Sequence, residues 1–164
     1  MSETEDYTIA APWDDITGKP TEWAPEAHAA DHEAGGADEM DCAGLAGRVN
    51  YVDRGDPAAA DWDQSMLTTD ALWRDLDCSA IVPAGAKAII LLVILYDDIV
   101  GGNIAFRKNG NTATHNAPRV YQSVSNLFFS GRVIVPCDAN RTIEYWATTK
   151  TWTLITITVS GWFI

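Results

Sequence analysis

The stretch GAKAIILLVILYD at residues 85–97 contains the longest apolar run of this 164-residue chain. Residues 88–96 are all apolar, which is the length of a strand and far short of the ~20 residues that cross a bilayer. A run in which neighbouring side chains are all apolar is typical of a strand that is covered on both faces. We therefore expect residues 88–96 to form a buried strand, and we expect no membrane insertion.

Further runs with strand character surround this stretch. They are residues 79–83, 103–108, 124–136, 141–147 and 152–164. The last run alternates, with Ile155, Ile157 and Val159 on one face and Thr or Ser on the other. The sequence NGN at residues 109–111 predicts a hairpin or loop.

Short strands separated by turns, without alternating helices, predict an all-β fold. At most, residues 65–76 would form a short helix. We expect residues 61–164 to form an antiparallel β-sandwich that is jelly-roll-like. Ile164 ends the last strand and is expected to be tied into a sheet, with Gly161 at a bulge or a close contact.

Residues 1–60 show little periodicity, and prolines and glycines interrupt them throughout. We expect an extended, mostly irregular N-terminal arm that cannot bury enough apolar surface by itself to offset the entropy of ordering. The arm nevertheless contains Trp13, Trp23, Leu45 and Tyr51, which is more apolar material than a linker needs. This combination predicts a segment that orders against another subunit or a larger particle.

Negative charge is concentrated in the first half of the chain. Residues 1–77 carry 19 acidic and four basic side chains, whereas residues 78–164 carry four acidic and seven basic ones. This composition argues against nucleic-acid binding by the first half, because phosphate contacts need Lys and Arg. An acidic arm suits solubility, a basic partner or docking on an assembly. The N-terminal residues MSETEDYT lack the features of a secretory signal.

Two histidines stand four residues apart in AHAADHEAGGADEMD, residues 27–41. The zinc-protease pattern His-Glu-x-x-His is not completed, because Gly36 stands where its second histidine belongs. A metal held between subunits by His28 or His32 with a neighbouring carboxylate stays open as an alternative. We interpret the segment as a tight turn hinged at Gly35 and Gly36, and we expect neither metal nor cofactor.

The sequence offers little for catalysis. It has no Gly-x-Ser-x-Gly elbow, no phosphate-cradling glycine loop and no nucleophile–base pair that spacing reveals, so we expect no enzyme. Cys42, Cys78 and Cys137 are expected to be free thiols, because they are odd in number and widely spaced. Arg-Gly-Asp at residues 54–56 and Asn-Arg-Thr at residues 140–142 are interpreted as turns.

Aromatic residues gather in the second half of the chain. Tyr145, Trp146 and Trp152 are candidates for a platform on which a sugar stacks, and the alternative is that they pack the core or a seam between subunits. If residues 141–147 form a strand, Tyr145 and Trp146 point to opposite faces, so at least one of them lies outside the core.

Residues 28–47, HAADHEAGGADEMDCAGLAG, resemble a segment of tailed-bacteriophage structural proteins, especially tail fibres and other virion appendages. The shared pattern is His-x-x-x-His-x-x-Gly-Gly-x-Asp followed by Gly-Leu-x-Gly. The matching residues are His28, His32, Glu33, Gly35, Gly36, Asp38, Glu39, Gly44, Leu45 and Gly47, and Met40 stands in place of the usual Ile. The runs of the second half are more loosely similar to the β-sandwich modules that follow such segments.

The resemblance implies a non-enzymatic virion protein, made in the host cytoplasm, that forms a homo-oligomer, often a homotrimer. The chain is short for a full tail fibre, so a capsid decoration (cement) protein or a short head or tail fibre fits its size better. Its expected partners are further copies of itself and the major capsid or tail protein. The alternative is a receptor- or carbohydrate-binding module at a fibre tip, with a host-surface glycan as ligand.

The residues expected to assemble and anchor the protein all lie in the arm. They are Trp13, Trp23, His28, His32, Gly35, Gly36, Asp38, Leu45 and Tyr51.

Overall fold

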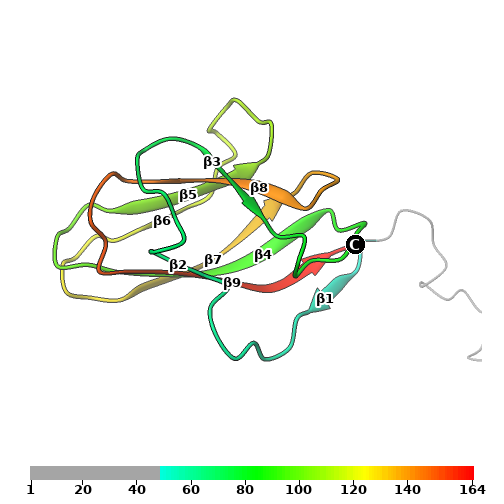
Figure 1. Ribbon diagram of the computed structural model, residues 1–164, viewed down its shortest axis with the longest axis horizontal. Coiled ribbons are helices and arrows are strands. Elements are labelled where there is room, and N and C mark those ends of the chain that lie inside the picture. Colours follow the sequence, from blue (N-terminus) through cyan, green and yellow to red (C-terminus); the bar gives the residue numbers. More distant parts are fainter. Residues whose placement is uncertain (1–48) are drawn as a thin grey trace, which may run out of the picture. The chain divides into compact units, whose positions relative to one another are not determined.

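The computed structural model describes residues 49–164, which form nine β-strands joined by loops. They are β1 (Tyr51–Asp53), β2 (Trp62–Asp63), β3 (Arg74–Asp77), β4 (Ala88–Tyr96), β5 (Asn103–Lys108), β6 (Arg119–Tyr121), β7 (Phe129–Pro136), β8 (Thr142–Ala147) and β9 (Leu154–Phe163). The strands form two antiparallel sheets, one layered over the other (Figure 1). The predicted all-β sandwich is confirmed.

The strand order identifies the sandwich as a jelly roll. Sheet A has the order β1-β9-β4-β7, with β2 also paired to β9, and sheet B has the order β3-β8-β5-β6. β1 pairs with residues 161–163 of β9 and β2 with residues 156–157, both on the side away from β4. They therefore act as one interrupted edge strand. Counted this way, eight strands have the orders 1-8-3-6 and 2-7-4-5, which is the jelly-roll arrangement.

The core lies between the two sheets. Alternate residues of β4 point inward and are fully buried, namely Ile89, Leu91, Val93 and Leu95. The alternation predicted for the last strand is also present, since Ile155, Ile157 and Val159 are buried. Sheet B contributes its own alternate residues to the same core: Ile104, Phe106, Ile143 and Tyr145.

Two side chains complete the interrupted edge of sheet A. Between β1 and β2, Arg54 forms an ion pair with Asp61. The Asp61 carboxylate accepts a hydrogen bond from the Val159 amide at 2.7 Å, and the Arg54 guanidinium donates one to the Val159 carbonyl at 3.1 Å. Both backbone groups of Val159 are thus satisfied by side chains where the edge strand is missing. Arg54, the first residue of Arg-Gly-Asp, has this structural role.

Several smaller predictions are confirmed. The register of β4 against β9 shifts between Ile90 and Leu91, and a side chain at Gly161 would collide with the ring of Tyr51, so this glycine marks both a bulge and a close contact. Ile164 is paired with Asn50 through two backbone hydrogen bonds. Cys78 and Cys137 are buried free thiols, and burial raises the pKa of Cys78 to about 12.

Three expectations about local structure are wrong. Residues 79–83 form a turn, in which the Cys78 carbonyl accepts hydrogen bonds from the amides of Ile81 and Val82. The run at residues 124–136 becomes a strand only at Phe129. Residues 65–76 form no helix, because the Asp63 carboxylate binds the Ser65 amide in a local turn and residues 74–77 pair with β8.

The sandwich also begins earlier than the predicted boundary at residue 61. The compact unit of the described chain spans Val49–Ile164, because β1 pairs with the end of β9. Residues 51–60 therefore belong to the sandwich and not to the arm.

Candidate functional site

Most of the predicted assembly residues lie outside the described residues. These are Trp13, Trp23, His28, His32, Gly35, Gly36, Asp38 and Leu45, and Cys42 lies there as well. Tyr51 is described: it lies in β1, is 52% exposed and packs its ring against Phe163 with 5.9 Å between the ring centroids. Its hydroxyl donates a hydrogen bond to Asp53 at 3.2 Å.

The three predicted stacking aromatics are not brought together on the surface. Tyr145 and Trp152 are only 4% and 6% exposed, so neither presents a ring face to solvent. The Tyr145 hydroxyl accepts a hydrogen bond from the Thr68 amide at 2.8 Å, and the Trp152 indole donates one to the Thr148 carbonyl at 3.2 Å. Trp146 lies on the opposite face of β8, half-buried on the outer face of sheet B. The predicted opposition of Tyr145 and Trp146 is confirmed.

The outer face of sheet B carries a second tryptophan that the sequence analysis did not single out. Trp73 packs against the guanidinium of Arg107, which lies 4.0 Å from the centre of its ring. Arg107 is 9% exposed and donates a hydrogen bond to the Glu144 carboxylate at 2.6 Å. It also donates to the Thr112 carbonyl at 3.2 Å. Trp73 and Arg107 therefore already have their contacts within the chain.

Trp146 is held in the same way. Its indole donates a hydrogen bond to the Ala71 carbonyl at 2.7 Å, and the guanidinium of Arg119 lies 5.6 Å from the centre of its ring. The segment before β3 thus lies over the outer face of sheet B. It contains Trp73, and the carbonyl of its Ala71 holds the indole of Trp146.

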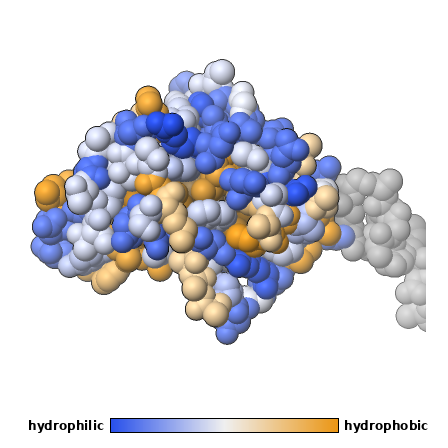
Figure 2. All heavy atoms as spheres, in the orientation of Figure 1, coloured by the Kyte–Doolittle hydropathy of each residue, from blue (hydrophilic) through white to orange (hydrophobic). Residues whose placement is uncertain are grey.

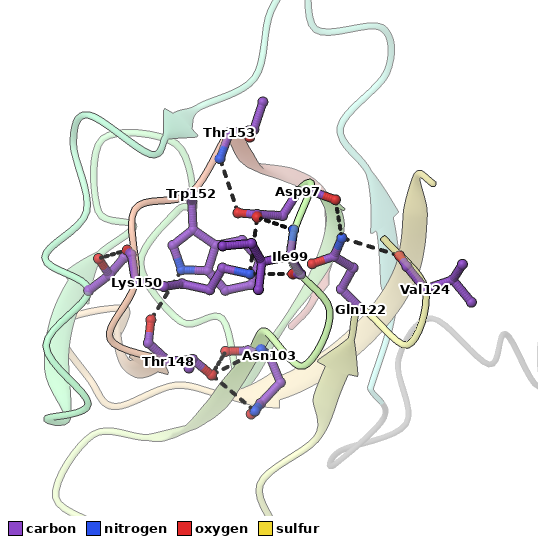
Figure 3. Close-up of polar contacts among 10 residues, drawn as sticks. Asp97, Ile99, Asn103, Gln122, Val124, Thr148, Lys150, Trp152 and Thr153 are labelled. Atoms are coloured by element: carbon purple, nitrogen blue, oxygen red, sulfur yellow. Dashed lines mark hydrogen bonds and ion pairs between the residues drawn. The ribbon is translucent and has the colours of Figure 1, made fainter. Parts of the chain in front are cut away.

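The most extensive polar network lies at one end of the sandwich, which we call the tip. It consists of the loops at residues 97–102, 122–128 and 148–153, seen at the left of Figure 1. The fully buried carboxylate of Asp97 accepts hydrogen bonds from the amides of Ile99 at 2.9 Å and Thr153 at 3.2 Å (Figure 3). The Lys150 ammonium lies 3.2 Å from the same carboxylate and donates a hydrogen bond to the Ile99 carbonyl at 2.6 Å. One carboxylate thus joins two of the three loops.

The third tip loop is fixed by the backbone of Asp97. Its carbonyl accepts hydrogen bonds from the side-chain amide of Gln122 at 2.6 Å and from the backbone amide of Asn126 at 2.8 Å. Burial raises the pKa of the Asp97 carboxyl, but its hydrogen bonds from Ile99, Lys150 and Thr153 outweigh burial, so this pKa lies below the ordinary value. Asp97 therefore stays ionised and holds the tip in one shape.

Exposed apolar side chains surround this network. The tip patch comprises Ile99, Val100, Tyr121, Val124, Leu127 and Phe128, each between 52% and 64% exposed. Hydrophobic atoms are visible at this end of the sandwich in Figure 2. The ring of Phe128 also stacks on Tyr96, with 4.6 Å between centroids, so the patch continues onto sheet A. Exposed apolar side chains that gather at one end of a domain are a feature of interaction sites.

The outer face of sheet A is the second apolar surface. Ile90, Leu92, Ile94 and Tyr96 of β4 point outward and are half-buried, and Ile134 of β7 beside them is 55% exposed. An antiparallel sheet with one solvated face normally alternates apolar and polar residues. On β4 this alternation is missing, so the inward and outward faces are both apolar.

Residues 49–164 contain no group of three or more His, Cys, Asp or Glu side chains placed to hold a metal ion. They include no helix with the length and hydropathy needed to cross a bilayer.

Comparison of the whole chain with known proteins found no matching family model, no matching curated protein and no matching solved structure.

Proposed function

We propose that this chain is a non-enzymatic structural subunit of a bacteriophage virion, a capsid decoration protein or a short head or tail fibre. In this proposal residues 1–48 anchor the subunit on the major capsid or tail protein, and the jelly roll is displayed with its tip outward. The subunit forms a homo-oligomer, with a trimer as the expected number of copies. The resemblance of residues 28–47 to phage structural proteins motivates the proposal.

The observation that carries the proposal is the opposition of two ends of the jelly roll. The described chain begins at Val49, and Asn50 is bonded to Ile164 at the end that we call the base. β4 starts at the base, where Ala88 pairs with Phe163, and ends at the tip, where Tyr96 pairs with Leu154. A strand of this length separates the two ends by about 27 Å. The chain thus joins the sandwich at the end opposite the tip patch.

The hydrogen bonds between the tip loops support a role in contacting a partner. Binding costs less when the contacting loops are already ordered. At the tip the two loops that carry the exposed apolar side chains are joined through Asp97 and Gln122 before any partner arrives. The tip patch is therefore presented in a fixed arrangement.

Anchoring is tested with virions assembled without this chain. The full-length protein is expected to bind them when added, whereas a variant lacking residues 1–48 is expected to remain unbound. The deletion stops before β1, so circular dichroism should show the same β-sheet content in both proteins. If the truncated protein binds virions as tightly as the full chain, the anchoring proposal is wrong.

The role of the tip is tested separately. Ile99→Ser and Phe128→Ser are expected to reduce attachment of the decorated virion to host cells without changing the binding of the protein to the virion. Leu72→Ser is the matched control, because Leu72 is 57% exposed outside the tip loops. Equal attachment by all three variants would contradict a contacting role for the tip patch.

A glycan-binding module is the second candidate, and it is favoured by the part of the Trp73 and Trp146 rings that stays exposed on the outer face of sheet B. Trp73 and Trp146 are both half-buried there, beside the charged side chains of Arg107 and Arg119. If a sugar stacks on this face, Trp146→Ala abolishes binding to a glycan array while virion binding persists. Tyr121→Ala, at the tip, is the control that should retain glycan binding, and equal glycan binding by both variants would dismiss this candidate.

A further inference from the structure

The outer face of sheet A has a charge pattern in addition to its apolar centre. The centre is formed by Ile90, Leu92 and Ile94 of β4 together with Thr156 and Thr158 of β9. The two edges of the face carry opposite charges. Arg132 lies on the β7 edge, and Asp53 and Asp63 lie on the edge formed by β1 and β2.

Strand register fixes the level of each charge along the strands. Arg132 is level with Leu92, because these two residues are Cα partners. Asp53 is level with Ile90 through Gly161, and Asp63 is level with Ile94 through Thr156. Residues two apart on a strand are separated by about 7 Å. Arg132 therefore stands at a level between the two aspartates, one step from each, which an arginine side chain spans.

Symmetry decides which edges meet when two such faces approach each other. A rotation axis parallel to the strands sets the β7 edge of one copy against the β1/β2 edge of the next. It also keeps every residue at the same level along the strands in both copies. This brings Arg132 of one copy between Asp53 and Asp63 of its neighbour. An axis across the strands instead sets β7 against β7 and β1/β2 against β1/β2, so like charges share each edge of the contact, which is disfavoured. The charges therefore select the axis parallel to the strands.

We infer that copies of this chain associate through the outer face of sheet A about an axis parallel to its strands. The inferred contact buries Leu92 and its apolar neighbours, with Arg132 of one copy paired to Asp53 and Asp63 of the next. Such an axis places every base at one end of the assembly and every tip at the other. This contact between copies is the one that would hold the proposed subunits together. The inference rests on the proposed function only for the number of copies that associate.

The first test is a change of the apolar centre in the full-length chain. Leu92→Asp is expected to weaken self-association at least a hundredfold, as measured by sedimentation equilibrium over a range of protein concentrations. A full-length wild-type chain that is monomeric at all concentrations, or a Leu92→Asp variant that associates as tightly as wild type, overturns the inference. The second result would mean that the copies associate through another surface.

The second test is a charge exchange, which does not depend on the stability of one variant. Arg132→Glu and Asp63→Arg are each expected to weaken association at least tenfold. The double variant is expected to associate at least threefold more tightly than either single variant, because the exchanged pair attracts again although Asp53 still repels the new carboxylate. Arg119→Glu is the matched control, since Arg119 is an exposed arginine on the outer face of sheet B. Failure of the double variant to recover, or an equal loss in the control, overturns the inferred contact.

Virion binding separates this inference from the proposed function. If the charge exchange behaves as expected but the associated full-length protein does not bind virions, the self-contact stands and the virion role fails. If the protein binds virions and the charge exchange has no effect, the virion role stands and the inferred contact fails.

Discussion

The outer faces of the two sheets differ in what lies against them. On sheet B the charged and aromatic side chains are occupied from within the chain, as Arg107 is by Glu144 and Trp73. On sheet A the outward residues of β4 are apolar, and Ile134 beside them is 55% exposed. Arg132 on this face forms no ion pair within residues 49–164.

Folding supplies contacts to the polar and aromatic side chains on the outer face of sheet B, whereas the outer face of sheet A is left for another molecule to cover. Polar groups of sheet B exchange their hydrogen bonds with water for hydrogen bonds with partners in the same chain, and this exchange contributes to stability. Apolar groups of sheet A keep part of their contact with water, and covering them would add roughly 25 cal/mol for each Å² removed. Substitutions on sheet B should therefore change unfolding, whereas those on the outer face of sheet A should change association.

The largest expected effect contrasts neighbours on opposite faces of β4. Leu91 is fully buried in the core and Leu92 points outward. Leu91→Ala should lower the free energy of unfolding by about 3 kcal/mol, because it removes buried methyl groups and leaves a cavity. Leu92→Ala should lower it by about 1 kcal/mol or less in dilute protein, yet weaken association. Urea denaturation and sedimentation measure the two quantities, and similar unfolding losses would refute the distinction.

The next effect contrasts two arginines. Arg107→Ala removes a partner from a mostly buried ion pair and should lower the free energy of unfolding by about 2 kcal/mol, without changing association. Arg132→Ala should change it by no more than about 0.5 kcal/mol, because Arg132 is exposed. Chemical denaturation of both variants checks this order. A larger unfolding loss for Arg132→Ala would mean that sheet A is also completed within the chain.

A smaller effect is expected from one hydrogen bond on sheet B. Trp146→Phe removes the indole donor to the Ala71 carbonyl and should cost about 1 kcal/mol of unfolding free energy. Trp73→Phe is the control, because its ring contact with Arg107 does not depend on the indole nitrogen. Thermal unfolding distinguishes them, and equal losses would show that ring size rather than the hydrogen bond determines the effect.

The smallest expected change is the pH dependence of the Asp97 network at the tip. The pKa of Asp97 is lowered in the folded protein, so its ionised form contributes stability above the ordinary value of about 4, and this contribution is lost as pH falls through the folded pKa. The difference in unfolding free energy between wild type and Asp97→Asn should be constant from pH 7 to 5 and shrink below about 4. A difference that stays constant to pH 2 would contradict the role of the ionised carboxylate.

The strands that carry the sandwich could be predicted from the sequence because their patterns are local. The apolar run of β4 and the alternation of β8 and β9 indicate strands without any knowledge of their neighbours. The expectation that β4 is covered on both faces is confirmed only for its inward face, because within the described residues its outward side chains are half-buried. The apolar residues at the outward positions of β4 were therefore the sequence signal of the apolar outer face of sheet A.

The tip could not be predicted, because its structure depends on contacts between distant segments. Leu127 and Phe128 look like the start of a strand, but the Asn126 amide is bound to the Asp97 carbonyl and Asn126 has a φ of 58°. The pairing of Asp97 with Lys150 has no spacing rule. Trp73 was missed for a similar reason, since only its contact with Arg107 of a non-adjacent strand identifies its environment.

The interrupted edge of sheet A bears on how such a protein behaves when it is crowded. An open sheet edge is a template on which a strand from another chain can be added, and repeated addition leads to aggregation. At Val159 that template is blocked, because the side chains of Asp61 and Arg54 already hold its amide and its carbonyl. Chains packed closely together can therefore meet face to face while this stretch of edge resists growth into a continuous fibril.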